Sequence, residues 1–131
     1  MTQLRISEAA ELLGVSDDTV RRMVDSGRLA ATRDDAGRLV VAGADLAGVA
    51  QEVARPAPVG DVSDESARNR MRGIVTRVLT DTVMAQVEMQ CGPFRIVSLL
   101  SREAVEALGL EVGSVAIASI KSTNVVIGVP R

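Results

Sequence analysis

The sequence predicts two small domains, an α-rich winged helix-turn-helix followed by an all-β, OB-like five-stranded barrel with one short helix. The stretch ARPAPVGDVSDE, residues 54–65, separates them, because its prolines fix φ and lack a backbone donor. Before this stretch the apolar residues recur mostly at the helical spacing, and after it mostly at the strand spacing of two. We therefore expect one domain in residues 1–54, a linker in residues 55–65 and a second domain in residues 66–131.

The amino-acid composition excludes several kinds of chemistry. The 131 residues contain no histidine, tryptophan or tyrosine, and only one cysteine and one phenylalanine, Cys91 and Phe94. A zinc, copper, haem or iron–sulfur site within one chain is therefore not expected, nor is a disulfide or catalysis by histidine. We expect Phe94 in the core, which disfavours base stacking on aromatic side chains. With no glycine-rich nucleotide-binding loop either, we do not expect an enzyme.

Charge is distributed unevenly around a net value of −2. Residues 1–55 carry seven arginines against nine acidic residues, whereas residues 66–131 carry seven arginines and one lysine against five acidic residues. The basic second part favours an anionic ligand there. No apolar run approaches the roughly 18 residues of a membrane span, and two glutamates stand where a signal peptide needs an apolar core. We expect a cytoplasmic protein with no membrane partner.

Two short helices with a tight connection are expected near the start of the first domain. Ser7 is the expected N-cap of the first helix, since its hydroxyl can accept a backbone N–H of the first turn, and Gly14 is its expected end. Ser16 is the expected cap of the second helix, which should end at Gly27. Helices joined this closely are typical of a helix-turn-helix.

The second helix should have one apolar and one polar face. Its apolar face consists of Val20, Met23 and Val24, with Leu12 and Leu13 as expected partners. Its polar face consists of Asp18, Thr19, Arg21, Arg22 and Asp25. The polar face is either a solvated surface, with an Asp18–Arg22 pair worth about 0.3–0.5 kcal/mol, or a surface that reads DNA. The helical spacing alone does not decide between the two.

A hairpin and a third helix should complete the first domain. Residues 29–32 and 38–41 have the pattern of strands around the turn DDAG, and a helix should begin near Asp45. Arg33 and Arg38 flank the turn, so the hairpin has the features of a basic wing. A recognition helix in the major groove with a wing on the backbone is a known way of docking on DNA.

Residues 4–41, LRISEAAELLGVSDDTVRRMVDSGRLAATRDDAGRLVV, resemble the excisionase/MerR-type winged helix-turn-helix. The shared pattern is EAA-x-LLGVS, TVRR, a small-residue break and G-x-L-x-A-x-R. The resemblance implies DNA binding, with three side chains near base edges or phosphates and three near the backbone. The first three are Thr19, Arg21 and Arg22, and the second three are Arg28, Arg33 and Arg38. Because this domain is acidic, we expect one copy to bind DNA poorly and an oligomer to bind through avidity.

The second domain should contain five strands and one helix. RGIVTRVLTD and TVMAQVEMQ form the first two strands, with a turn near residues 80–82, and the third strand follows CGP at residues 94–100. Ser101 should cap a helix that ends at Gly109. SVAIASI and VVIGV complete the five strands. A helix between the third and fourth strands is the order of an OB-like barrel.

Two segments of the second domain are rich in hydrogen-bond donors and free of acidic residues. SARN, residues 66–69, offers a hydroxyl, a guanidinium and an amide, and KST, residues 121–123, offers an ammonium and two hydroxyls. A tetrahedral dianion that loses water on binding needs donors on several sides and no carboxylate nearby. Lys121 is the only lysine, and its compact ammonium suits a small cage better than the planar fork of arginine. Alternatively, the segments are only the lead into a strand and a hairpin turn.

SARN-x-M-x-G-x-V, LGL-x-x-G and IKSTNV resemble the molybdate/tungstate-binding Mop (molbindin, TOBE domain) family throughout residues 66–131. The resemblance implies that the ligands are Ser66, Arg68, Asn69, Lys121 and Ser122, with Ser98 as a further candidate. It also implies molybdate or tungstate as the bound ligand, no organic cofactor, and sites at the subunit interfaces of a homo-hexamer, a trimer of dimers. A dimer is the alternative assembly. Gly92-Pro93 replaces the family's usual Gly-Gly, a departure that leaves open whether this loop contributes a ligand.

Three functions are compatible with these patterns. The first is a molybdate-responsive DNA-binding transcriptional regulator, in which the anion biases the arrangement of the subunits and so of their DNA-binding heads. The second is a molybdate storage or buffering protein whose helix-turn-helix does not read DNA, which the acidic first domain favours. The third is an enzyme of molybdenum-cofactor metabolism, against which the lack of histidine and of a cysteine pair argues.

Overall fold

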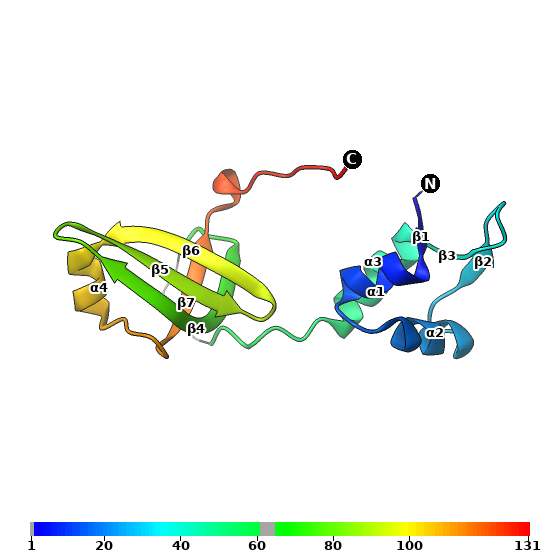
Figure 1. Ribbon diagram of the computed structural model, residues 1–131, viewed down its shortest axis with the longest axis horizontal. Helices are drawn as coiled ribbons and strands as arrows, with labels where there is room; N and C mark the ends of the chain where they lie inside the picture. Colours follow the sequence, from blue (N-terminus) through cyan, green and yellow to red (C-terminus); the bar gives the residue numbers. More distant parts are fainter. Residues whose placement is uncertain (1, 61–64) are drawn as a thin grey trace. The chain divides into compact units, whose positions relative to one another are not determined.

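The computed structural model describes residues 2–60 and 65–131, which divide into two compact units, Met1–Arg55 and Pro56–Arg131 (Figure 1). Residues 61–64 of the expected linker lie outside the described residues. Each unit has a sheet and an apolar core of its own. Within the described part of the chain, no helix is long and apolar enough to cross a membrane.

The first unit combines three helices with a three-stranded sheet. Its elements are β1 (Gln3–Arg5), α1 (Ile6–Leu13), α2 (Asp17–Asp25), β2 (Ala31–Arg33), β3 (Leu39–Ala42) and α3 (Gly43–Val53). Strand β3 is central and pairs antiparallel with both β1 and β2. Strand β1 is not among the expected elements, because three residues are too few to show an alternation and gain strand structure only through pairing with β3. Helix α3 begins at Gly43, slightly before the expected start near Asp45.

The core of the first unit lies where α1, α2 and α3 meet the central strand. Val20 and Met23 are buried there and Val24 and Leu13 pack against it, as the helical spacing predicts. The predicted contact of Leu12 is wrong, since its side chain is 67% exposed. Leu12 and Leu13 are about 100° apart around α1, and only Leu13 is turned toward the core.

The caps of α1 and α2 differ from each other. Ser16 accepts a hydrogen bond from the Thr19 N–H at 3.2 Å, which confirms the predicted cap of α2. Ser7 is not a cap, because β1 leads directly into α1 and Arg5 takes the N-cap position. The Arg5 N–H donates to Glu8 Oε1 at 3.2 Å, so a carboxylate replaces the expected hydroxyl. At the other end, α2 runs to Asp25 with Ser26 as its C-cap, and Gly27 follows in the left-handed conformation, with φ 81°, as the predicted end of the helix.

The second unit is a four-stranded antiparallel sheet with one helix. Its elements are β4 (Asn69–Thr80), β5 (Met84–Cys91), β6 (Phe94–Ser101), α4 (Arg102–Leu108), β7 (Val115–Ile120) and the 3₁₀ turn η1 (Ser122–Asn124). The strand order is β6-β5-β4-β7, so β6 and β7 are the edges. Alternate side chains of β5 (Ala85, Val87 and Met89) form the core with neighbours from β4 and α4. The sheet is strongly twisted and fits half of an OB-like barrel (Figure 1).

Gly73 allows β4 to approach β5 closely. A Cβ at this position would lie 2.5 Å from the Gln90 carbonyl oxygen and 2.6 Å from Cys91 Sγ, closer than real side chains come. The register of β4 on β5 shifts between Val75 and Arg77, just beyond the glycine. Because a bulge raises the local twist, the glycine and the bulge together let the sheet curl.

Two expectations for the second unit are wrong. Residues 125–129, the expected fifth strand, form no strand, because the chain leaves β7, turns through η1 and runs away from its own sheet (Figure 1). The apolar pattern of residues 125–129 is that of a strand, but a strand forms only where the edge of a sheet lies beside it. Phe94, expected in the core, is 65% exposed because it begins edge strand β6 directly after the Gly92–Pro93 turn.

Candidate functional site

The two donor-rich segments meet at one end of the β4–β7 pair. Strand β4 begins at Asn69 and β7 ends at Ile120, and these two residues are partners in the antiparallel register. The Asn69 Nδ2 group donates to the Ile120 carbonyl oxygen at 3.1 Å, although the two residues are 51 positions apart. The structure therefore places Asn69, the last residue of the first segment, opposite the residue that directly precedes Lys121.

The segment after β7 offers backbone and side-chain donors together. Lys121 is extended, with φ −63° and ψ 140°, and η1 follows it. The Asn124 N–H donates to the Lys121 carbonyl at 2.9 Å, and the Val125 N–H to the Ser122 carbonyl at 3.2 Å. The first N–H groups of such a turn have no partner inside it. Lys121, Ser122 and Thr123 are all exposed, so both kinds of donor are open to a ligand.

The segment before β4 is anchored at one residue and open at its neighbours. Ala67 is only 7% exposed, whereas Ser66 and Arg68 on either side of it are exposed. Burial of Ala67 fixes this stretch of backbone against the unit. The hydroxyl and the guanidinium are thus held near Asn69 while remaining accessible.

One carboxylate lies close to this cluster. Glu65 Oε1 accepts hydrogen bonds from Arg70 Nε at 2.9 Å and from Ser119 Oγ at 2.8 Å. Arg70 Nη2 also donates to the Glu65 carbonyl oxygen at 3.2 Å. The Arg70 guanidinium offsets the carboxylate charge next to the donors, and the hydrogen bond from Ser119 ties the segment before β4 to β7.

Sequence reasoning missed Glu65 and Arg70. Glu65 was grouped with the acidic linker, and no local pattern shows that an arginine neutralises it. Arg68 and Arg70 are two positions apart, the spacing of one face of a strand. That spacing is the signal that could have found Arg70 as a companion of the cluster.

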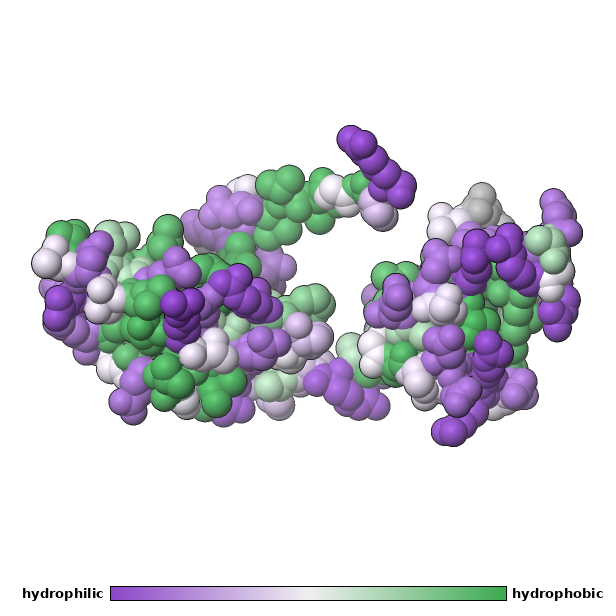
Figure 2. All heavy atoms as spheres, in the orientation of Figure 1, coloured by the Kyte–Doolittle hydropathy of each residue, from purple (hydrophilic) through white to green (hydrophobic). Residues whose placement is uncertain are grey.

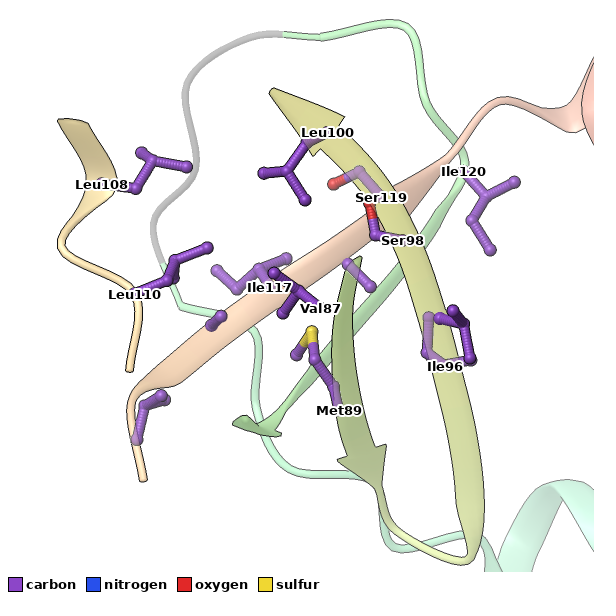
Figure 3. A pocket seen from close by; sticks show the side chains of 14 residues that line it. Val87, Met89, Ile96, Ser98, Leu100, Leu108, Leu110, Ile117, Ser119 and Ile120 are labelled. Atoms are coloured by element: carbon purple, nitrogen blue, oxygen red, sulfur yellow. The ribbon is translucent and has the colours of Figure 1, made fainter. Parts of the chain in front are cut away.

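Ser98 is outside the two donor-rich segments, but it shares a cavity with Ser119 and Ile120, which bond to Glu65 and Asn69. It belongs to β6 and lines a cavity of about 500 Å³ together with Ser119 and Ile120 of β7 (Figure 3). Most of the other lining side chains are apolar, so the cavity itself is not built for an anion. Among the hydrogen bonds of residues 2–60 and 65–131, none joins Ser98 to Asn69 or Lys121.

Helix α2 presents two arginines on its polar face. Arg21 and Arg22 are exposed, and neither takes part in an ion pair within the described residues. Thr19 is half-buried, and its Oγ1 lies 3.0 Å from Ser16 Oγ inside the helix cap. The two guanidinium groups are therefore the freer donors of this helix.

The arginines around the β2–β3 hairpin make contacts within the unit. Arg33 Nη1 donates to a carbonyl of the turn at 2.8 Å, and Arg38 Nε lies 3.6 Å from Asp34 Oδ2. Arg28 Nη2 lies 3.4 Å from Glu52 Oε2 of α3. All three arginines are exposed, and exposed pairs of this kind contribute only about 0–1 kcal/mol. A phosphate could therefore replace the present partners.

The turn between β4 and β5 contains a carboxyl with a shifted pKa. Asp81 Oδ1 accepts the N–H groups of Met84 at 2.7 Å and Val83 at 2.8 Å. These bonds, Met84 first, hold the pKa of Asp81 below its ordinary value. The group lies far along β4 from Asn69, so it stabilises the hairpin and does not belong to the donor cluster.

Comparison with known proteins assigns both units. The TOBE domain family matches residues 65–127, and the helix-turn-helix domain family matches residues 4–52. Over 65 residues the chain is 42% identical to a probable molybdenum-pterin-binding protein of Haemophilus influenzae, covering 49% of this chain and 94% of the relative. Over 63 residues it is 38% identical to molybdenum-pterin-binding protein 3 of Clostridium pasteurianum, covering 47% of this chain and 93% of that relative.

A solved structure is similar to about half of the chain. It is the cytoplasmic molybdate-binding protein ModG with molybdate bound, which is 40% identical and gives a TM-score of 0.50. The match covers 52% of this chain and 49% of ModG, so the chain spans about half the length of that protein. The chain belongs to the TOBE domain family through its second unit, and its first unit carries a helix-turn-helix domain.

Proposed function

We propose that the second unit binds molybdate or tungstate between residues 66–69 and the start of η1. The observation that carries the proposal is the Asn69–Ile120 hydrogen bond in the β4–β7 register, which joins two acid-free, donor-rich segments. The relatives support the choice of ligand, since their names describe molybdenum-pterin-binding and molybdate-binding proteins. The proposed ligands are Ser66, Arg68, Asn69, Lys121 and Ser122, with Ser98 as a further candidate. The proposal is one of binding without catalysis and without an organic cofactor.

Among the proposed ligands, some supply positive charge and others supply directed hydrogen bonds. Lys121 and Arg68 place positive charge beside the dianion, and the Ser66 and Ser122 hydroxyls can point single protons at its oxygens. Asn69 has two amide protons, of which the Ile120 carbonyl uses one. The second proton remains for the anion, so the residue that fixes the geometry also contributes a ligand.

A second copy of the chain is needed to complete such a site. In the single chain the proposed ligands are exposed, whereas a tightly held dianion must be shielded from water. We therefore propose a homo-oligomer with anions at its subunit interfaces, either a hexamer arranged as a trimer of dimers or a dimer. ModG is described as cytoplasmic, and we place this chain in the cytoplasm as well.

A molybdate-responsive transcriptional regulator is the function that we favour. Residues 1–54 would read DNA, residues 55–65 would connect, and residues 66–131 would bind the anion. Helix α2 would place Thr19, Arg21 and Arg22 in the major groove, with Arg28, Arg33 and Arg38 on the backbone. The anion would alter DNA binding only if it binds one arrangement of the subunits more tightly than another.

A molybdate store or buffer is the second candidate function. Residues 1–55 are net acidic, whereas DNA-binding domains normally present a basic surface. In addition, Arg28 and Arg38 already have carboxylate partners within their unit. In this alternative the first unit does not read DNA, and the anion site serves storage alone.

Calorimetric titration with sodium molybdate tests the anion site. Lys121→Ala should weaken binding about 10- to 100-fold, because a hydrogen bond to a charged group is worth roughly 1.5–3 kcal/mol. Lys121→Arg keeps the charge and should also weaken binding, because the planar fork does not fit the place of an ammonium. Arg131→Ala removes a charge elsewhere in the unit and should leave the affinity unchanged. Unchanged affinity in Lys121→Ala would refute the assignment.

Fluorescence anisotropy with a labelled promoter fragment separates the regulator from the store. A regulator should bind the fragment at moderate salt, respond to molybdate and lose affinity in Arg22→Ala. Arg55→Ala is the matched control, because this exposed arginine lies outside α2 and the hairpin. If the protein shows no specific binding to the fragment, with or without molybdate, the regulator function is excluded and the storage function is favoured.

A further inference from the structure

Two donors beside the proposed anion site are held by a carboxylate of the chain itself. Glu65 Oε1 accepts hydrogen bonds from Arg70 Nε at 2.9 Å and from Ser119 Oγ at 2.8 Å. Arg70 and Ser119 are partners in the β4–β7 register, directly next to the Asn69–Ile120 pair. A carboxylate oxygen that accepts from a guanidinium and a hydroxyl together makes the kinds of contact that the proposed site offers to a dianion.

The Glu65–Arg70 ion pair is more shielded from water than the other ion pairs of residues 2–60 and 65–131. The Arg70 and Glu65 side chains are 31% and 34% exposed, whereas each of the other pairs includes a side chain that is at least 53% exposed. Arg70 Nη2 also donates to the Glu65 carbonyl oxygen at 3.2 Å. Because a shielded pair loses less of its attraction to solvent, Glu65 holds Arg70 more firmly than a surface carboxylate would.

Glu65 stands between the linker and the proposed ligands. It is the last residue of the expected linker and directly precedes Ser66. Ala67, two positions further on, is buried, so the backbone near Glu65 is fixed close to the proposed site. A dianion bound there therefore meets the Glu65 carboxylate, which repels it and uses two donors that the dianion could use.

We propose that Glu65 stands in for the anion, so that its carboxylate holds Arg70 and Ser119 in the anion-free chain and a bound dianion displaces it and takes both as ligands. The inference rests on the proposed anion site and adds two residues to it. Two negative charges replace one beside the Arg70 guanidinium, which favours the dianion over the carboxylate. Displacement also releases the end of the linker, so the anion distinguishes two states of the chain, as the regulator requires.

Calorimetric titration of the full-length Glu65→Gln variant with sodium molybdate tests the competition. The variant should bind about 3- to 10-fold more tightly, because the anion no longer displaces a carboxylate or approaches its charge. Glu111→Gln removes the same charge from an exposed position of the second unit and should bind like the wild type. Equal affinities of Glu65→Gln and a binding wild type would refute the competition alone. If neither protein binds molybdate, the proposed function fails and this inference fails with it.

The opposite change in affinity would identify Glu65 as a structural brace. If Glu65 only fastens the segment before β4, Glu65→Gln should lower both the affinity for molybdate and the thermal midpoint of unfolding. That result would overturn the proposal, because a competitor cannot be removed at the cost of affinity.

Arginine substitutions in the Glu65→Gln background test whether Arg70 becomes a ligand. In this background Arg70→Gln leaves no carboxylate without its partner, so its effect reports the contact with the anion. It should weaken binding about 10-fold or more, because a hydrogen bond to a charged group is lost. Arg72→Gln is the control, since Arg72 is exposed and lies opposite Ile117, further along β4. Equal affinities with and without Arg70 would overturn its role as a ligand.

NMR of the Arg70 Nε–H group follows the displacement itself. The signal is assigned by its loss in Arg70→Gln. Without molybdate it should differ between the wild type and Glu65→Gln, because only the wild type supplies a carboxylate partner. At saturation with molybdate the two signals should coincide, because the anion is then the partner in both proteins. A difference that persists at saturation would show that Glu65 keeps Arg70, and would contradict the displacement.

Discussion

The two units of the chain differ in how completely they bury their apolar residues. In the described part of the first unit, Leu12 is the one exposed large apolar side chain, and nine buried residues form the core. The second unit is longer, yet among its residues 56–60 and 65–131 the core has six buried members and fourteen large apolar side chains are exposed. Chain length therefore does not explain the difference.

This contrast is the one expected if the second unit associates with another copy, as we propose, and the first unit does not need to. In the second unit the exposed residues include the apolar segment 125–129, seen as hydrophobic spheres beyond η1 in Figure 2, and the β6 residues Val97 and Leu99. A unit that completes its core with a second chain becomes more stable as the protein concentration rises. The stability of the first unit should not depend on concentration.

Leu29→Ala should have the largest effect and should act on the first unit alone. Leu29 is 1% exposed, and removing such a side chain destabilises a core by about 2–5 kcal/mol. Hydrogen exchange should show protection lost in residues 3–53 and retained in residues 69–120. Leu12→Ala is the control and should change stability by less than about 0.5 kcal/mol. Loss of protection in both units would show that they do not fold independently.

Gly73→Ala should have the next largest effect and should act on the second unit. The added Cβ would lie 2.5 Å from the Gln90 carbonyl oxygen, and overpacking of this kind destabilises by roughly 1–3 kcal/mol. Gly128→Ala is the control, since no atom lies within 4 Å of its added Cβ. Circular dichroism should show a lower thermal midpoint only for Gly73→Ala. A wild-type midpoint in that variant would mean that β4 does not need the close approach.

Asp81 should have the smallest effect, confined to the second unit at acidic pH. Because its pKa is lowered in the folded state, its contribution is complete above the ordinary carboxyl pKa of about 3.9 and is lost as pH falls through the folded-state value. Asp81→Asn keeps an acceptor oxygen but has no carboxyl to protonate. In this variant the free energy of unfolding should therefore fall less as the pH is lowered. Denaturant unfolding at several acidic pH values measures it, with Asp35→Asn of the first unit as the control. An identical pH profile in Asp81→Asn would contradict the account.

Local features of the fold were predictable from the sequence except where long-range pairing intervenes, as at Ser7, which is not a cap because β1 leads directly into α1. Ser16 and Ser101 cap α2 and α4 as predicted, because a cap depends only on residues within one turn. The unpaired state of residues 125–129 and the pairing of β1 were not predictable, since both depend on an edge elsewhere in space. The exposure of Phe94 has the same cause, because its place on an edge strand follows from the strand order.

In the candidate site, too, the local features were predictable from the sequence and the long-range pairing was not. Sequence reasoning could select SARN and KST by their donors and lack of acid, and the resemblance could pair them. The register that sets Asn69 against Ile120 appears only in the sheet. The role of Arg70 in neutralising Glu65 also depends on that register, because it places Arg70 opposite Ser119.

Native mass spectrometry of the full chain with molybdate tests the central claim most directly, namely that the second unit associates and holds the anion. We expect an assembly of two or six 13.8 kDa chains that retains molybdate, and a Lys121→Ala assembly of the same size without it. A single chain without bound molybdate, under conditions in which the protein is folded, would contradict the account.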